Sequence, residues 1–116
     1  MLAYIPMDAS LATVGIARMV VTGPVVAAID NGTLTTEFFD ECMNRHQRGD
    51  WGLTDPEDTG VNEVALEHGG RVMSVYPLPQ PIGRDEHLWI MSYGGFITDG
   101  DDRLFAQTEV MFPSDY

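Results

Sequence analysis

Residues 45–52 read RHQRGDWG, and this stretch predicts the corner at which helices meet the sheet. Its two arginines and His46 crowd the last turn of an expected helix, where positive charge meets the negative end of the helix dipole. Gly49 then ends that helix, because glycine readily takes the left-handed conformation of a C-terminal turn. We expect Trp51 to anchor this corner in the core.

The chain before the corner predicts one strand and two helices. Residues 14–21 (VGIARMVV) have the composition of a strand. Pro24 suits the first turn of a short helix, which Asn31-Gly32 can close in a left-handed turn. A second helix begins at Thr35 or Thr36. Helical spacing assigns these residues to its inward face: Phe38, Phe39, Cys42, Met43 and His46.

The chain after the corner predicts a third helix. Residues 54–58 (TDPED) combine an N-cap carboxylate, a proline in the first turn and acidic charge at the positive end of the helix dipole. Gly69-Gly70 ends this helix. Helical spacing assigns one of its faces to four residues: Val61, Val64, Ala65 and His68.

Three strands follow, because residues 71–78, 87–97 and 103–112 are rich in aromatic and β-branched side chains. Asp99-Gly100 is typical of a tight hairpin, and Gly94-Gly95 indicates a bulge in the middle strand. These turn signals make an antiparallel arrangement of the last three strands the simplest prediction.

Length and composition fit one compact fold, since 116 residues with 44% hydrophobic content can bury a core. The sequence predicts a single α+β domain over residues 1–116, with an N-terminal strand and three short helices packed on a three-stranded antiparallel β-meander. No apolar run approaches the ~20 residues that span a bilayer, and no leader pattern opens the chain. We therefore expect a cytoplasmic protein whose lone cysteine, Cys42, serves as buried packing.

Charge is the most unusual property of the composition. Eighteen acidic residues face six basic ones, all of them arginine, for a formal net charge of -12. Such a surface repels nucleic acid and anionic membranes and steers basic partners toward it. The missing lysine excludes Schiff-base and P-loop lysine chemistry, and the sequence contains no cofactor motif. We expect no direct nucleic-acid binding, no membrane binding and no cofactor.

A set of residues after position 40 carries a resemblance to a known family. The set comprises His46, the run Gly49 to Gly52, Asn62, Ala65, Leu66, Gly70, Arg71, the run Ser74 to Tyr76, Trp89, Ile90 and the run Pro113 to Tyr116. It resembles a family of small bacterial proteins of no established activity, encoded on plasmids and other mobile elements, with a pattern close to RHxxGDWG, ALxxGGRxxSxY, WIxT and LPxxY. The resemblance implies a mobile-element or phage-borne gene rather than a chemistry. The chain departs from the pattern in a longer and more acidic final hairpin.

Charge and resemblance together suggest an acidic, non-enzymatic interaction protein of a mobile element. It would act as a DNA mimic, an anti-restriction or anti-CRISPR inhibitor that occupies the basic nucleic-acid-binding groove of a host defence nuclease complex. The expected partner-binding surface is a ribbon of carboxylates: Asp55, Glu57, Asp58, Glu63, Glu67, Asp85, Glu86, Asp99, Asp101 and Asp102. An exposed sheet face around Trp89 and Tyr93 would favour a homodimer.

The alternative is a small enzyme, or a ligand- or metal-binding protein, with a site formed by His46, Asp50, Trp51 and Arg71. Under this alternative a pocket opens beside the GDWG turn. Asp55 and His68 could add donors to His46 and Asp50, but their spacing matches no metal motif, so we expect no metal site. In the structural interpretation, His46 packs against Trp51 while Asp50 accepts backbone hydrogen bonds in the turn.

Overall fold

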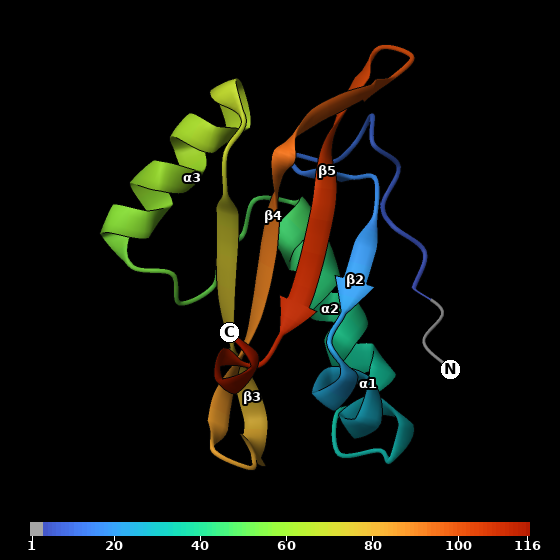
Figure 1. Ribbon diagram of the computed structural model, residues 1–116, viewed down its shortest axis with the longest axis vertical. Coiled ribbons are helices and arrows are strands. Elements are labelled where there is room, and N and C mark those ends of the chain that lie inside the picture. Colours follow the sequence, from blue (N-terminus) through green and yellow to red (C-terminus); the bar gives the residue numbers. More distant parts are fainter. Residues whose placement is uncertain (1–3) are drawn as a thin grey trace.

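The computed structural model describes residues 4–116, which contain three α-helices, five β-strands and one 3-10 turn (Figure 1). In chain order the elements are β1 (Gly15–Ile16), β2 (Met19–Val21), α1 (Gly23–Asp30), α2 (Thr36–Gln47), α3 (Pro56–His68), β3 (Val72–Ile82), β4 (Asp85–Asp99), β5 (Asp102–Met111) and η1 (Pro113–Asp115). The prediction of an α+β fold is confirmed. None of the helices in this part of the chain combines the length and the apolar character that crossing a bilayer requires.

The five strands form one mixed sheet, in which β5 lies between β4 and the two N-terminal strands. β4 pairs antiparallel with β3 and with β5, whereas β1 and β2 both run parallel to β5. The predicted antiparallel meander is present as β3, β4 and β5, but the sheet is larger than predicted and mixed, because β1 and β2 join it in parallel with β5. The predicted strand 14–21 is also divided, since Ala17 and Arg18 link β1 to β2 without belonging to either.

A glycine lets β1 approach β5. A Cβ atom on Gly15 would lie 2.6 Å from Leu104 Cδ2 and 3.0 Å from the carbonyl oxygen of Arg103. Any larger residue at this position would therefore push β1 away from its partner strand.

The helices are not equivalent in how they meet the sheet. α1 and α2 cover one face, and their buried residues, such as Val25, Phe39 and Met43, pack in one cluster with Tyr76 and Ile90 of the sheet (Figure 1). α3 lies beside the edge strand β3 instead (Figure 1). α3 packs against the sheet at this edge, where Ala65 joins a cluster with Val72 and Phe105, and it does not cover a face. One face of the sheet therefore carries no helix.

α3 is held by polar contacts as well as by the apolar contacts of Ala65 and Leu66. Asn62 is fully buried, and its side-chain amide donates to the carbonyl of Met73 at 2.8 Å and accepts from the Met73 N–H at 2.9 Å. Val61 and Val64 are 43% and 60% exposed, so the face predicted to be apolar points largely to solvent. Ala65 is the residue of that set that does reach the core.

The outer edge of β3 is closed to further strand pairing. The Asn62 side chain hydrogen-bonds the backbone N–H and carbonyl of Met73. The GDWG turn and the residue after it bond the backbone of Val75: Val75 N–H donates to the Trp51 carbonyl at 3.1 Å, and Leu53 N–H donates to the Val75 carbonyl at 2.7 Å. Every second residue that follows is a proline, which has no N–H to donate: Pro77, Pro79 and Pro81. This edge is therefore unfavourable for the addition of a further strand.

The last two long strands form a hairpin that projects past α1 and α2 (Figure 1). Asp99 pairs with Asp102, which confirms the predicted tight turn at Gly100. The register shifts between Tyr93 and Phe96, which confirms the predicted bulge. The other connection is shorter than predicted, because β3 and β4 extend until Ile82 pairs with Asp85.

Arg103 joins this hairpin to α3. Its guanidinium donates to the carbonyls of Leu66 at 2.5 Å and Glu67 at 3.3 Å, and it lies 4.0 Å from the centroid of the Phe96 ring. These carbonyls belong to the last turn of α3, where no further helical N–H is available to satisfy them.

Candidate functional site

The GDWG corner is organised around the imidazole of His46, which is fully buried. Its Nδ1 lies 2.6 Å from Ser74 Oγ, and its Nε2 lies 2.9 Å from Ser92 Oγ, which lies 2.7 Å from Thr108 Oγ1. The Trp51 ring meets the imidazole edge to face at a centroid distance of 6.0 Å. The predicted contact between His46 and Trp51 is confirmed.

This environment keeps the imidazole neutral. Burial lowers the pKa of His46 from 6.5 to about 3. A neutral ring offers one N–H donor and one acceptor, and the two serine hydroxyls satisfy both. The ring and both hydroxyls are fully buried, so a substrate would not reach them. Their hydrogen bonds hold α2 to β3 and β4.

The other residues of the predicted alternative site are divided between two places. Asp50 stays at the corner, where its carboxylate accepts from Arg45 Nε at 2.7 Å and from the Gly52 N–H at 3.1 Å. The hydrogen bond from Arg45 lowers the pKa of Asp50. Arg71 instead donates to Asp58 Oδ1 at 3.2 Å, on the α3 side of the sheet. The structure therefore brings together His46, Asp50 and Trp51 but not Arg71.

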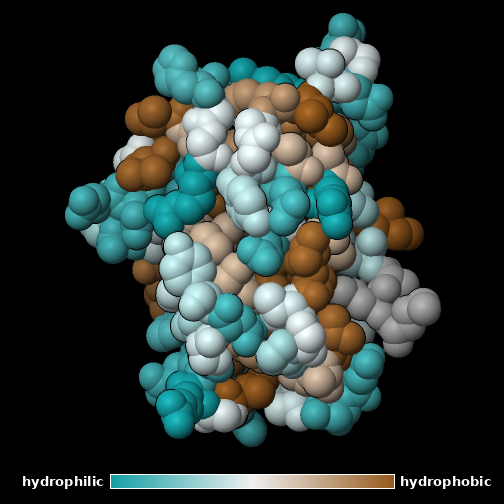
Figure 2. Space-filling view, in the orientation of Figure 1, coloured by the Kyte–Doolittle hydropathy of each residue, from teal (hydrophilic) through white to brown (hydrophobic). Residues whose placement is uncertain are grey.

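The sheet face that no helix covers, which we call the open face, carries a cluster of side chains separate from the GDWG corner. Strand alternation places Leu88 and Ile90 against the helices and their neighbours Trp89 and Met91 on the opposite side. The open face consists of Met73, Val75, Trp89, Met91, Tyr93 and Met111. Across the middle of this side of the molecule, hydrophobic surface (tan and brown) alternates with more hydrophilic surface (white and teal) (Figure 2).

A cavity of about 510 Å³ opens where this face meets the start of α3. Its lining comprises Leu53, Thr54, Asp55, Asp58, Arg71, Met73, Val75, His87, Trp89, Met91 and Tyr116. A pocket does therefore lie beside the GDWG turn, but it is lined by the residues that follow the turn and not by His46, Asp50 or Trp51.

Tyr116 completes this cavity from the far end of the chain. Its ring meets that of Trp89 edge to face at a centroid distance of 5.7 Å, while its own side chain stays 80% exposed. The preceding 3-10 turn is fixed from two sides. Asp85 accepts from Ser114 N at 3.0 Å and from Ser114 Oγ at 2.7 Å, and Asp115 accepts from Thr22 Oγ1 at 2.8 Å. The position of Tyr116 over the open face is thus set by the fold.

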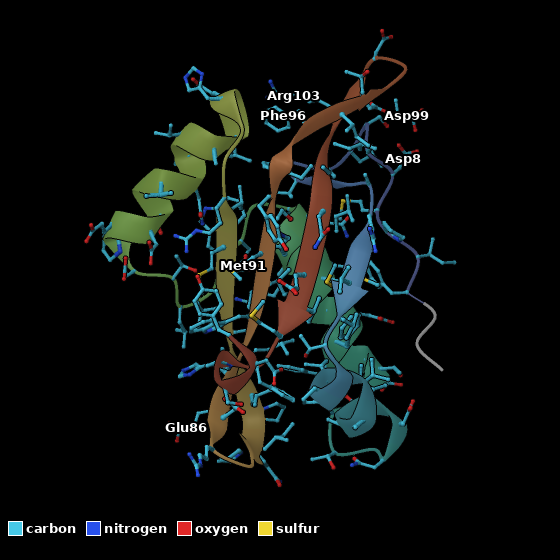
Figure 3. All side chains as sticks on the ribbon, in the orientation of Figure 1. Asp8, Glu86, Met91, Phe96, Asp99 and Arg103 are labelled. Atoms are coloured by element: carbon cyan, nitrogen blue, oxygen red, sulfur yellow. The ribbon has the colours of Figure 1, made fainter. Side chains whose placement is uncertain are left out.

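The ten predicted partner-binding acids lie in three groups around the open face. Five of them belong to the start and the length of α3, and three lie at the tip of the β4–β5 hairpin, which Arg103 links to the end of α3. The remaining two lie at the β3–β4 turn, at the opposite end of the molecule: Glu86 and Asp99 mark these two ends in Figure 3, with Met91 of the open face between them. Asp85 in this last group is 8% exposed and holds Ser114, so Glu86 is the exposed member of the pair.

Sequence reasoning missed the residues that line this cavity, because they come from distant parts of the chain. Trp89 and Met91 had a signal, since residues 88–91 (LWIM) are apolar at four successive positions rather than at alternate ones, which indicates a strand with two covered or contacting faces. Tyr116 had no such signal, because its place depends on the contacts of Asp85 and Asp115.

Within residues 4–116, no group of three or more His, Cys, Asp or Glu side chains is arranged to hold a metal ion. Comparison with family models, with curated proteins and with solved structures found no match. The candidate functional site therefore rests on the geometry of the open face and its cavity.

Proposed function

We propose that this chain is a non-enzymatic interaction protein of a mobile genetic element, and that it binds a basic protein surface through the open face and the acids around it. The partner that we propose is a host defence nuclease complex, whose nucleic-acid-binding groove the acidic protein occupies. The observation that carries the proposal is a methionine- and aromatic-lined sheet face that no helix covers, bordered by α3 with its acidic side chains.

The composition of the open face supports binding to a protein. Met73, Met91 and Met111 lie side by side and are only 8%, 5% and 3% exposed, so the half-buried Trp89 and Tyr93 form the accessible part of this face. Aromatic residues and methionine are the types enriched at protein interfaces. Methionine also adapts its shape to different partners. The closed edge of β3 is consistent with binding at a face, because a partner cannot readily add a strand at this edge.

Charge supports a basic partner over a second copy of the chain. A homodimer through the open face would bring two chains of formal net charge -12 together with their acidic borders adjacent, and like charges at an interface oppose association. A basic groove built for phosphates would meet the same borders with attraction. The resemblance to mobile-element proteins supports a defence enzyme as the owner of that groove.

The proposal can be tested with purified restriction endonucleases and CRISPR effector nucleases. Binding is measured by biolayer interferometry at rising salt and in competition with the substrate DNA of each nuclease. We expect affinity to fall as salt rises, because screening weakens attraction between exposed charges, and we expect DNA to displace the protein. Binding that is indifferent to salt and to DNA would refute the DNA-mimic part of the proposal.

Two charge-matched variants separate a defined acidic surface from diffuse charge. One carries Glu57→Gln, Glu63→Gln and Glu67→Gln on α3, and the control carries Glu37→Gln, Asp40→Asn and Glu41→Gln on α2. Each removes three negative charges, but the two helices lie in different places relative to the open face (Figure 1). We expect the α3 variant to lose more affinity than the α2 variant. Equal losses would contradict an acidic surface centred on α3.

A further inference from the structure

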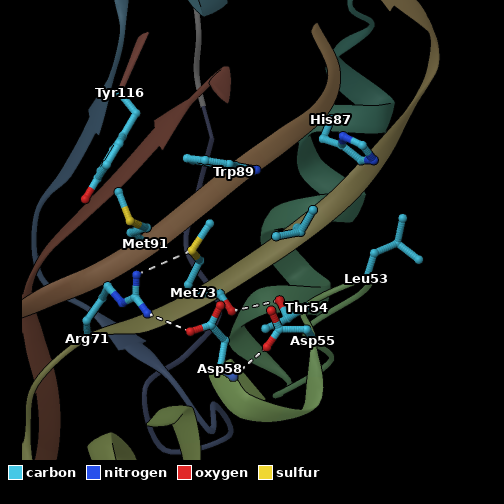
Figure 4. A pocket seen from close by; sticks show the side chains of 11 residues that line it. Leu53, Thr54, Asp55, Asp58, Arg71, Met73, His87, Trp89, Met91 and Tyr116 are labelled. Atoms are coloured by element: carbon cyan, nitrogen blue, oxygen red, sulfur yellow. Dashed lines mark hydrogen bonds and ion pairs between the residues drawn. The ribbon is translucent and has the colours of Figure 1, made fainter. Parts of the chain in front are cut away.

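The cavity of the open face differs from an ordinary apolar groove because aromatic and acidic side chains lie on opposite sides of it. Figure 4 shows Trp89 and Tyr116 on one side, Asp55 and Asp58 on the other, and the thioethers of Met73 and Met91 between them. Aromatic rings attract cations through the negative charge of their faces, and carboxylates attract them directly. Arg71 also lines the cavity, paired with Asp58, so Asp55, Asp58 and Arg71 together leave a formal charge of -1 there (two carboxylates and one guanidinium). The rings and this net negative charge both favour a cation.

The carboxylates keep bonding capacity toward the cavity. Asp55 accepts the Asp58 N–H through Oδ1, and Asp58 accepts Arg71 through its own Oδ1, at 2.8 and 3.2 Å. Within residues 4–116, neither Oδ2 atom has a hydrogen bond. Asp58 and Arg71 remain 37% and 38% exposed, so their ion pair does not seal the cavity floor.

We propose that this cavity binds the guanidinium of an arginine side chain presented by the partner protein. A guanidinium stacks on an aromatic ring and offers paired N–H donors to carboxylates, whereas an ammonium group does so less well. The inference rests on the proposed function, because it takes the partner to be a basic protein. The cavity volume of about 510 Å³ accommodates the whole arginine side chain.

The test uses N-acetyl-arginine amide as the probe and the indole N–H signal of Trp89 in a nitrogen-15 NMR spectrum as the readout. Trp51, which is 8% exposed at the GDWG corner, provides an internal reference signal. We expect the Trp89 signal to shift saturably with a Kd on the order of 1–10 mM, and the Trp51 signal to stay in place. The neutral N-acetyl-citrulline amide, which has nearly the same shape, should bind at least about fivefold more weakly.

Three variants identify the contacting groups. Tyr116→Ala removes an exposed ring, and Asp58→Asn removes one charge at constant size. Each should weaken binding of the arginine probe about fivefold. Glu37→Gln, on the exposed surface of α2, also removes one negative charge but lies outside the cavity lining, and it should leave the Kd unchanged. The thermal midpoint of each variant verifies that it is folded.

The results separate this inference from the proposed function. Equal binding of the arginine and citrulline probes, binding of N-acetyl-aspartate amide in place of arginine, or a Kd insensitive to both Tyr116→Ala and Asp58→Asn would overturn the guanidinium site. If nuclease binding still depended on α3, the proposed function would stand without it. If the arginine probe bound as expected but no nuclease did, the site would stand and the proposed function would fall.

Discussion

Replacing His46 by alanine tests whether the GDWG corner is structural. The ring is fully buried between Ser74 and Ser92, so its removal leaves a cavity and takes a partner from two buried hydroxyls. A cavity of aromatic size costs about 3 kcal/mol, and each orphaned hydroxyl adds up to about 1 kcal/mol. We expect His46→Ala to lower the free energy of unfolding by about 3–5 kcal/mol, measured by urea denaturation.

The same residue predicts how stability depends on pH. The pKa of His46 is about 3 in the folded chain against 6.5 in the reference state, so the unfolded chain binds more protons between these values. The stability that the neutral ring provides is present above pH 6.5 and is lost as pH falls toward 3. At about 1.4 kcal/mol per pKa unit, the difference between 6.5 and about 3 gives an upper limit of about 5 kcal/mol.

His46→Gln provides the control for this pH dependence, because glutamine does not titrate. Protonation of the many carboxylates changes stability in both proteins alike, so the difference in unfolding free energy between native chain and variant isolates the imidazole. We expect this difference to shrink as pH falls from 7 to 4. A difference that stays constant over that range, or a loss below about 1 kcal/mol in His46→Ala, would refute the structural role assigned to the ring.

Three further predictions concern the corner, the edge of the sheet and the lone thiol. Gly52→Ala should lower stability by more than about 2 kcal/mol in the same assay, because φ is +65° and the new Cβ would lie 2.2 Å from the Val75 carbonyl oxygen; a neutral effect would contradict this geometry. Asn62→Ala should lower the free energy of unfolding by about 2–3 kcal/mol, because it leaves the backbone N–H and carbonyl of Met73 unpaired. Hydrogen exchange of the Met73 amide should become faster, and an unchanged exchange rate would argue against the edge contact. Burial raises the pKa of Cys42 to about 12, so iodoacetamide at pH 8 should alkylate it only after urea is added, as mass spectrometry would show; ready alkylation of the folded chain would contradict its burial.

Local signals in the sequence predicted most of the elements. The N-cap of α3 at Asp55, the bulge before Phe96 and the turn at Gly100 are formed by residues close together in the chain, and the structure has them as predicted. The parallel pairing of β1 and β2 with β5 could not be predicted in this way, because it joins residues about 90 positions apart, such as Gly15 and Leu104.

The candidate site was predictable only in part. The corner was visible in RHQRGDWG, and the structure confirms the His46–Trp51 contact and the role of Asp50 in the turn. α3 was misjudged because a buried asparagine, rather than the apolar stripe of Val61 and Val64, attaches it to the sheet. Once α3 lies at the edge, one sheet face stays uncovered, and helical periodicity alone does not reveal that placement.

The central claim is that the chain binds through the open face of its sheet. The most direct test follows the methyl signals of carbon-13-labelled methionine while a short arginine-rich peptide is added at low salt. Met73, Met91 and Met111 lie on the open face, whereas Met43 lies in the core beneath α2 and serves as the control. The account predicts saturable shifts of the first three signals with Met43 unchanged. Shifts spread equally over all four, or restricted to Met43, would contradict it.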